Sequence, residues 1–326
     1  MFRAKTLILR FALPSPARTP LRPGLRRLAS TGFAPPKDLA HTVGELGLVR
    51  GGRTFEAIAA SSLLGGIFLS FSGCFYLTVH GGSTELRKTH PGFHSLLSAL
   101  VFPSGLAMIS LCGSDLLTSA MMYCVAPFYT HAATRNVHLR ALARVWGASL
   151  GGNLVGSVLL AGAAASCFVP PGSPAVASAI EIAEKKAALP AGVAFVKAVG
   201  ANFLVNTAIV MTIGAQSAGG KIAALWAPIT IFVALGLEHS VANMFFLPMG
   251  MFCGANVGVG DIVGNLVPVI AGNAVGAFLL TRLLVGTMPL AAALAARALP
   301  MGASPGSLAL PPLTLRNVWG GRKGAA

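Results

Sequence analysis

The side chains with the clearest capacity for chemistry lie in the second half of the chain, where Glu238 and His239 are adjacent. Glu238 is the only charged residue in the apolar run 222–260, and His239 is the only histidine after His138. An imidazole can donate or accept a hydrogen bond, and it can exchange a proton near neutral pH because its free pKa is about 6.5. Ionisable side chains are costly in hydrocarbon, so we expect this pair to face a protein interior or a water-filled path.

The residues around this pair indicate how it is positioned. The stretch Gly236-Leu237-Glu238-His239-Ser240-Val241-Ala242-Asn243-Met244 is rich in small and polar residues, which is typical of a broken helix. Irregular backbone at membrane depth is tolerated only where protein buries it or where it lines a cavity. A second apolar run, 95–128, has Asp115 as its only charged residue and is too long for one plain span. Its internal Pro103 and Gly113 predict a second break.

Composition indicates that both breaks lie in a membrane protein. Hydrophobic residues make up 54% of the chain and charged residues 10%, with a mean hydropathy of +0.74. Soluble domains carry about 25% charged residues. A bilayer span needs about 20 apolar residues. The chain offers six such segments, at about 57–79, 95–128, 145–166, 187–215, 222–260 and 262–281. The net charge of +15 has no interleaved aromatic residues, which favours membrane topology and targeting over nucleic-acid binding.

An internal repeat predicts the fold within this all-α class. The segment Gly152-Asn153-Leu154-Val155-Gly156-Ser157 resembles Gly272-Asn273-Ala274-Val275-Gly276-Ala277. Asn153 follows Thr118 by 35 residues, and Asn273 follows His239 by 34. A unit of three spans that is repeated must reverse its topology, because three is odd. Inverted repeats with broken helices at matching places indicate a substrate path near the bilayer midplane.

The first 37 residues differ from the rest of the chain. They contain eight Lys or Arg residues and no acid, and Arg26-Arg27-Leu28-Ala29-Ser30-Thr31 is typical of a processing region. This pattern predicts an organellar transit peptide, with a cytosolic tail as the alternative. The compartment is then the plastid inner envelope or, alternatively, the mitochondrial inner membrane. We expect three parts: a transit peptide and flexible region at 1–50, a membrane domain at 51–285 and a tail at 286–326.

Taken together, these segments resemble the formate/nitrite transporter family. The similarity covers about residues 54–281 and rests on 236–244, on 197–205, and on Gly264-Asn265-Leu266-Val267-Pro268 with the following Gly272-Asn273-Ala274-Val275-Gly276. The loop of the second helix departs from the family pattern Gly-x-Glu-Leu-Phe-Thr-Gly-Asn. Here Leu117 replaces the Phe, and Ser119-Ala120 replaces Gly-Asn. These replacements predict a wider constriction or a shifted substrate preference.

The resemblance implies six transmembrane helices in an aquaporin-like inverted three-helix repeat, with the second and fifth helices broken. It also implies a homopentamer in the lipid bilayer, each protomer with its own pore, and no cofactor. The implied substrates are small monovalent weak-acid anions, with nitrite or formate foremost and lactate, acetate or hydrosulfide in some members.

Roles for individual residues follow from this hypothesis. We expect His239 to hydrogen-bond the anion and to supply a proton, so that the anion crosses as the neutral acid. Thr118 on the facing broken helix would orient the imidazole. The remaining candidates are an apolar constriction at Leu116 and Leu117, lining at Phe75, Phe203 and Val205, a vestibule cation at Lys197, amide donors at Asn202 and Asn243, and structural caps of the half-helix N-termini at Asp115 and Glu238.

Other interpretations remain open from the sequence. His239 would serve equally as a core histidine bonded to a carbonyl, and Lys197 as a lysine that snorkels to the interface. An aquaporin-like channel for a neutral small solute is the alternative function, although the chain has no Asn-Pro-Ala box. An enzyme is disfavoured because we find no paired catalytic carboxylates and no nucleophile motif. The five cysteines form no CxxC pair, and no metal site is indicated.

Overall fold

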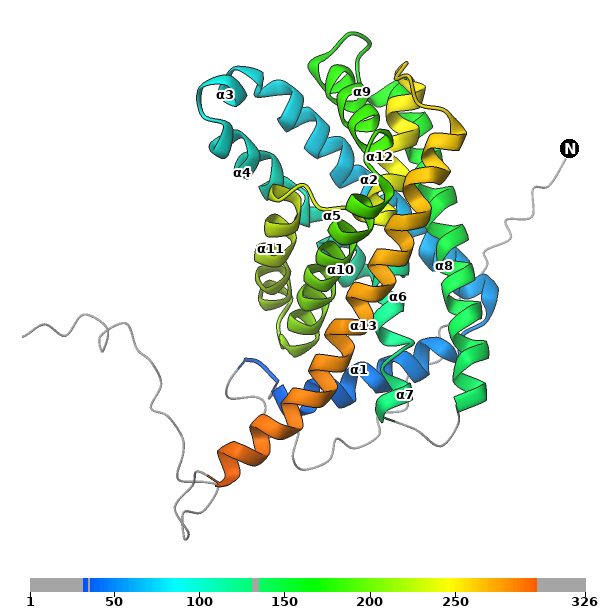
Figure 1. The fold of residues 1–326 in the computed structure, drawn as a ribbon, viewed down its shortest axis with the longest axis vertical. Helices are drawn as coiled ribbons and strands as arrows, with labels where there is room; N and C mark the ends of the chain where they lie inside the picture. Colours follow the sequence, from blue (N-terminus) through cyan, green and yellow to red (C-terminus); the bar gives the residue numbers. More distant parts are fainter. Residues whose placement is uncertain (1–31, 35, 131–134, 298–326) are drawn as a thin grey trace, which may run out of the picture.

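A computed structural model of the chain describes residues 32–34, 36–130 and 135–297 (Figure 1). The described residues are almost entirely helical, with one isolated bridge between Phe33 and Ala215. In order along the chain the helices are α1 (Pro36–Gly51), α2 (Phe55–Gly82), α3 (Thr84–Thr89), α4 (Pro91–Val101), α5 (Pro103–Cys112), α6 (Leu117–Tyr123), α7 (Pro127–Thr130), α8 (Arg135–Ala163, followed by a π-helical turn at Ala164–Phe168), α9 (Pro174–Ala187), α10 (Ala191–Gly214), α11 (Ala218–Ala234), α12 (Ser240–Phe252) and α13 (Val259–Arg297).

Five helical stretches among the described residues are long and apolar enough to cross a membrane. They are Phe55–Gly82, Pro91–Cys112, Leu139–Phe168, Ala191–Gly214 and Val259–Gly286, and α4 and α5 together form the second of them. The shorter apolar helices α11 and α12 together make up the fifth predicted segment, 222–260. The prediction of an all-α, multi-pass membrane protein is therefore confirmed.

Both predicted helix breaks are present. Helix α5 ends at Cys112, its C-cap Gly113 has a left-handed φ of 71°, and an irregular segment then leads to α6. Helix α11 ends at Ala234, and the chain passes through Gly236, with a φ of 60°, before α12 begins at Ser240. Glycine adopts positive φ at little cost, so each break begins where the sequence allows the helix to end. The half-helices α6 and α12 thus start inside the protein.

The predicted repeat appears as two matched helix pairs. Helix α2 packs along α8, and α10 packs along α13 (Figure 1). Small residues permit this close packing, as is common between membrane helices. A Cβ atom at any of four glycines would lie 2.2–2.5 Å from a carbonyl oxygen of the partner helix, namely at Gly152, Gly156, Gly272 or Gly276.

Helix α1 was not expected from the sequence. It crosses the lower end of the molecule in Figure 1, near α6 and α13, and it buries Leu39 and Val43. The domain boundary drawn at residue 51 left this helix out because its charged and polar residues hide its short apolar face from a hydropathy pattern. The proposed leader otherwise lies mainly outside the described residues.

The other end of the domain also differs from expectation. A tail was predicted from residue 286, but α13 continues without a break from Val259 to Arg297. The rest of the predicted tail lies outside the described residues.

Candidate functional site

The two broken helices bring His239 and Thr118 together. His239 directly precedes α12, Thr118 is the second residue of α6, and their side chains are 3% and 0% exposed. The hydroxyl oxygen of Thr118 lies 2.9 Å from Nε2 of His239. The half-helix N-termini thus meet at a buried polar contact between residues 121 positions apart.

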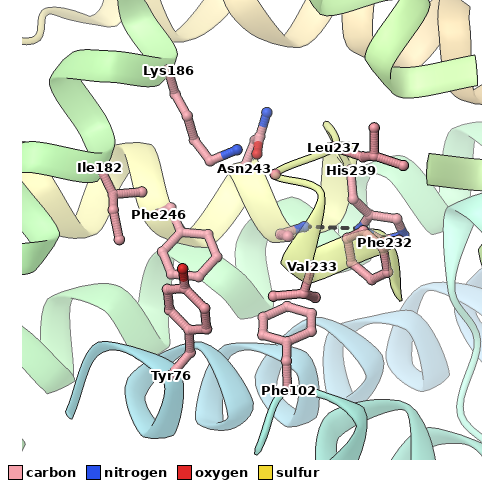
Figure 2. Close-up of a pocket in the computed structure, with 12 residues that line it drawn as sticks. Tyr76, Phe102, Ile182, Lys186, Phe232, Val233, Leu237, His239, Asn243 and Phe246 are labelled. Carbon is pink, nitrogen blue, oxygen red and sulfur yellow. Dashed lines mark hydrogen bonds between the residues drawn. The ribbon is translucent and has the colours of Figure 1, made fainter. Parts of the chain in front are cut away.

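The geometry assigns the tautomer of His239. Its Nδ1 accepts a hydrogen bond from the backbone N–H of Ala242 at 3.2 Å, so His239 is itself the N-cap of α12 (Figure 2). A neutral imidazole has one donor nitrogen and one acceptor nitrogen. Because Nδ1 accepts, Nε2 carries the hydrogen and donates it to Thr118. The hydroxyl hydrogen of Thr118 is then available as a donor to another group.

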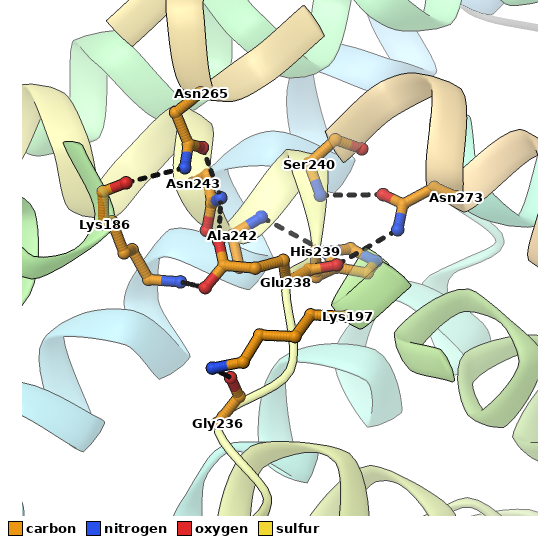
Figure 3. Close-up of polar contacts among 10 residues, drawn as sticks. All are labelled: Lys186, Lys197, Gly236, Glu238, His239, Ser240, Ala242, Asn243, Asn265 and Asn273. Carbon is orange, nitrogen blue, oxygen red and sulfur yellow. Dashed lines mark hydrogen bonds and ion pairs between the residues drawn. The ribbon is translucent and has the colours of Figure 1, made fainter. Parts of the chain in front are cut away.

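Two buried asparagines hold the starts of the half-helices in the same way. Asn273 accepts from the backbone N–H of Ser240 at 2.8 Å and donates to the carbonyl of Glu238 at 3.1 Å (Figure 3). It also donates to the carbonyl of Ala198 at 2.9 Å.

Asn153 makes the corresponding contacts in the first repeat. It accepts from the N–H of Leu117 at 2.8 Å and donates to the carbonyls of Asp115 and Ser62 at 3.1 and 2.6 Å. The repeated Gly-Asn motif therefore does more than permit close helix packing. It supplies the buried partners that irregular backbone requires inside a membrane.

The two acidic residues have partners other than those predicted. Glu238 accepts from Nζ of Lys186 at 2.8 Å and from Nδ2 of Asn243 at 2.6 Å, and Asn243 also donates to Asn265 (Figure 3). Asp115 pairs instead with Arg50 and Arg53. The prediction that these carboxylates cap half-helix N-termini was wrong. The caps come from His239 and the two asparagines. Each carboxylate lies one residue before the N-cap position of its half-helix and pairs with a cation from another part of the chain.

Three cavities follow one another along the interface of the repeats. The first, the Lys186 vestibule, has a volume of about 80 Å³ and is lined by Lys186, Asn243, His239 and the aromatic residues Tyr76, Phe102, Phe232 and Phe246. Figure 2 shows Lys186 and Asn243 on one side of this cavity and the rings of Tyr76 and Phe102 on the other.

The next cavity, the apolar gap, holds only about 10 Å³ and is lined by His239 and by apolar side chains, among them Phe232, Leu116 and Val205. His239 and Phe232 border both the vestibule and the gap. Among the described residues that line the gap, His239 is the only polar one.

The third cavity, the Arg50 vestibule, has a volume of about 210 Å³ and shares Leu116 with the apolar gap. Arg50 and Lys221 line it together with several hydroxyl side chains. Arg53, just outside it, has its pKa lowered from the usual value, first by burial and then by the nearby charge of Arg50. Cations therefore line both ends of the path, and its narrow central part is apolar.

The structure places some of the other predicted residues on this path and others away from it. Leu116 and Val205 line the apolar gap, whereas Leu117 is buried beside it and lines none of the three cavities. Phe75 is 50% exposed on the outside of the protomer, and Phe203 is only partly buried and lies on none of the cavities. The expectation that these two rings line the path is not supported by their placement.

Two predicted polar residues serve the backbone in the described structure. Asn202 on α10 donates to the carbonyls of Thr118 and Asn273, at 3.2 and 2.7 Å, so it ties the half-helix α6 to α13. Lys197 donates to the carbonyl of Gly236 at 3.2 Å and lines none of the three cavities. It supports the loop before α12 from outside the Lys186 vestibule.

The cation and most of the aromatic lining were missed from the sequence. Nothing in the local sequence distinguishes Lys186 from Lys185. One signal was present: Glu238 is an isolated acid in a long apolar run and requires a cationic partner from elsewhere in the chain. Among the described residues, no group of three His, Cys, Asp or Glu side chains is placed to hold a metal ion.

The fold and this path define a class. Two inverted three-helix units, each with a half-helix that begins at the protein centre beside a buried polar pair, form an aquaporin-like membrane transport protein.

Comparison with known proteins gives the family. The sequence model described as formate/nitrite transporter matches residues 37–286, and the chain belongs to this family. A probable formate transporter of Methanothermobacter thermautotrophicus is 33% identical over 262 residues, covering 76% of this chain and 93% of the relative. The formate channel FocA of Escherichia coli K12 is 30% identical over 244 residues, covering 68% and 82%.

Solved structures agree with this assignment. A pentameric formate channel with formate bound superposes with a TM-score of 0.62 at 28% identity, covering 74% of this chain and 98% of that one. An ion channel of the same family gives a TM-score of 0.65 at 24% identity, which supports the fold. These relatives are transporters and channels rather than enzymes. The family assignment made from the sequence is therefore confirmed.

Proposed function

We propose that the chain conducts small monovalent anions of weak acids, with formate or nitrite as substrate, along the path from the Lys186 vestibule to the Arg50 vestibule. The observation that carries this proposal is the buried Thr118–His239 hydrogen bond, whose imidazole borders an apolar gap between two cation-lined cavities. The names of the relatives, which include formate channels and a probable formate transporter, support the same substrate class.

The charges explain how an anion would be drawn in. Cations that line a cleft raise the local concentration of anions. Lys186 pairs with Glu238, but of these two side chains only the lysine lines the Lys186 vestibule. At the other end, Arg50 and Arg53 share the single carboxylate of Asp115, and Lys221 adds a further positive charge. Both vestibules therefore favour anions over cations and neutral solutes.

The apolar gap explains why the chemistry of His239 matters. A bare anion in a gap of this size would lose its hydration, and desolvating a charge is costly. Hydrogen bonds from Thr118 and His239, or transfer of a proton to the anion, would offset that cost. We propose proton-linked passage, in which His239 supplies the proton.

Proton linkage has a structural consequence in this site. The single hydrogen of neutral His239 lies on Nε2, and Nδ1 is engaged as the cap of α12. A second proton would have to enter at Nδ1, where it replaces the bond from Ala242. Proton loading of His239 would therefore loosen the first turn of α12, whereas simple anion conduction would leave this cap intact.

Flux in proteoliposomes tests the proposal. We expect radiolabelled formate or nitrite uptake to fall about tenfold or more in His239→Ala and Thr118→Val, because each variant removes one partner of the central Thr118–His239 hydrogen bond. Thr207→Val is the matched control, since the Thr207 hydroxyl bonds only within its own helix. Unchanged anion flux in both site variants would contradict the proposal, as would water flux in the wild type without anion flux.

A pH-sensitive dye inside the vesicles tests proton linkage. With empty liposomes subtracted, proton-linked uptake acidifies the lumen in proportion to the anion taken up. Equal anion uptake without acidification, with the membrane potential clamped, would show uncoupled conduction and would refute the proton-linked part alone.

We also propose that the chain assembles as a homopentamer in an organellar membrane. The pentameric neighbour supports the assembly, and the basic composition of residues 1–37 supports the location. Mass measurement in detergent tests the first point, and fluorescent tagging of residues 1–50 tests the second.

A further inference from the structure

A pair of histidines lies outside the transport path, behind the wall of the Lys186 vestibule. His80 on α2 and His94 on α4 have ring centroids 4.7 Å apart, with an interplanar angle of 59°. Nδ1 of His80 is 2.7 Å from the hydroxyl of Ser178 on α9, and Nδ1 of His94 is 2.9 Å from the hydroxyl of Ser83. The pair thus joins three helices at one point.

The hydrogen bonds place the hydrogen of neutral His94 on Nδ1 and leave Nε2 without a hydrogen and without a partner. Nδ1 of His94 lies 3.1 Å from the backbone carbonyl of Ser83, which can only accept, so Nδ1 carries the hydrogen. The hydroxyl of Ser83 donates to the carbonyl of Val79 and can accept from the same Nδ1. The other nitrogen, Nε2, is buried without a hydrogen-bond partner in a side chain that is 4% exposed. A second proton would therefore place a charged N–H where it has no acceptor.

The charges around the pair oppose protonation further. On α2, Tyr76 stacks on His80 at 5.3 Å. Arg87 on α3 and Lys185 on α9 are positive, and Glu181 on α9 is bonded to both of them. The Arg87 hydrogen bonds lower the pKa of Glu181 to about 2, so this carboxylate stays charged while imidazoles titrate. Its charge is already divided between two cations, and a proton on either imidazole would meet an environment with excess positive charge.

The pair also contacts the vestibule wall. Tyr76 lines the Lys186 vestibule and packs edge-on against Phe102 and Phe246, at 6.2 and 5.7 Å. Helix α9, which holds His80 through Ser178, carries Lys186 two turns later. A shift of α9 at Ser178 would move Lys186, and a shift of His80 would move the ring of Tyr76, which faces Lys186 across the vestibule.

We propose that His80 and His94 form a pH-responsive element that loosens the α2–α4–α9 wall of the Lys186 vestibule when the solution on that side becomes acidic. The packed arrangement requires both imidazoles to be neutral. Like charges this close repel, and the buried nitrogen of His94 offers a new hydrogen no partner. The element regulates entry to the path and is separate from the chemistry proposed for His239.

Hydrogen exchange of the full chain in nanodiscs tests this inference without substrate. We expect the backbone amides of 83–94 and 174–187 to exchange roughly tenfold faster at about pH 5.5 than at about pH 7.5, after correction for intrinsic rates, because local opening becomes easier. His94→Gln should reduce this pH response to less than about twofold. The more exposed His80→Gln provides the same test if His94→Gln does not fold.

His90→Gln is the matched control, since His90 is exposed and lies at the start of the same helix. It should retain the wild-type response. An equal pH response in all variants, or none in the wild type, would overturn the proposal. Because the measurement needs no transport, its failure is distinct from failure of the proposed function.

Discussion

The buried asparagine Asn273 allows a quantitative test of how the broken helices are held. Replacing it by alanine removes one accepted and two donated hydrogen bonds. Its side chain is fully buried, so water cannot replace these partners. The N–H of Ser240 and the carbonyl of Glu238 lie in irregular backbone and would lose the partner that the asparagine supplies.

The magnitude follows from two bounds. Three transmembrane hydrogen bonds at an average of about 0.6 kcal/mol each give a loss of about 2 kcal/mol. Two buried groups left unsatisfied at about 2 kcal/mol each give about 4 kcal/mol. We therefore expect Asn273→Ala to lower the free energy of unfolding by about 2–4 kcal/mol. Asn153→Ala should cost about the same, because Asn153 makes the equivalent three bonds in the first repeat.

Unfolding in mixed micelles with increasing SDS measures this free energy, with formate flux as a second readout because α12 carries His239. Asn256→Ala is the matched control, since this asparagine is exposed and only its backbone N–H forms a hydrogen bond. A loss below about 0.5 kcal/mol in both site variants would refute the argument that these side chains satisfy the breaks. A large loss in one variant alone would refute the equivalence of the repeats.

Three further predictions concern the surroundings of the path. Lys186→Gln should lower anion flux severalfold, most strongly at low salt, because it removes the cation of the vestibule. Lys197→Gln is the control and should change flux little, because Lys197 lines none of the three cavities. Equal effects of the two substitutions would refute the assignment of Lys186 as the vestibule cation. The pKa of Glu181 is about 2 because of its bonds with Arg87, below its usual value of 4.5, so its stabilising contribution is complete above pH 4.5 and is lost as the pH falls toward 2. Thermal unfolding across this range should show a smaller pH slope in Glu181→Gln, and an unchanged slope would contradict this. Gly250→Ala should lower the free energy of unfolding by about 1–3 kcal/mol, because its Cβ would lie 2.2 Å from a side chain of α9. If the variant unfolds in SDS with wild-type stability, α12 can move away from α9 without cost, and the prediction is refuted.

Some features of the site could be predicted because they depend on local sequence. The break before α12 shows in Gly236 and in the isolated Glu238–His239 pair, and the break before α6 shows in Gly113. The nearly equal spacing of Thr118 and His239 to a Gly-Asn motif placed the two residues at matching positions of the predicted repeat. Helix α1 escaped prediction because its burial depends on the packed domain above it rather than on its own hydropathy.

The amino-acid sequence by itself determined that the chain folds in a lipid bilayer, where two of its helices must break, and which histidine lies buried at one of those breaks. These properties come from composition, glycine conformations and the cost of charge in hydrocarbon, all of which act over short stretches. Only the tertiary structure decided that Lys186 rather than Lys197 faces the path, that Asp115 and Glu238 pair with distant cations, and that Phe75 points outward. These outcomes depend on how helices far apart in sequence rotate and pack against one another, and a side chain's own neighbours in the chain do not specify that rotation.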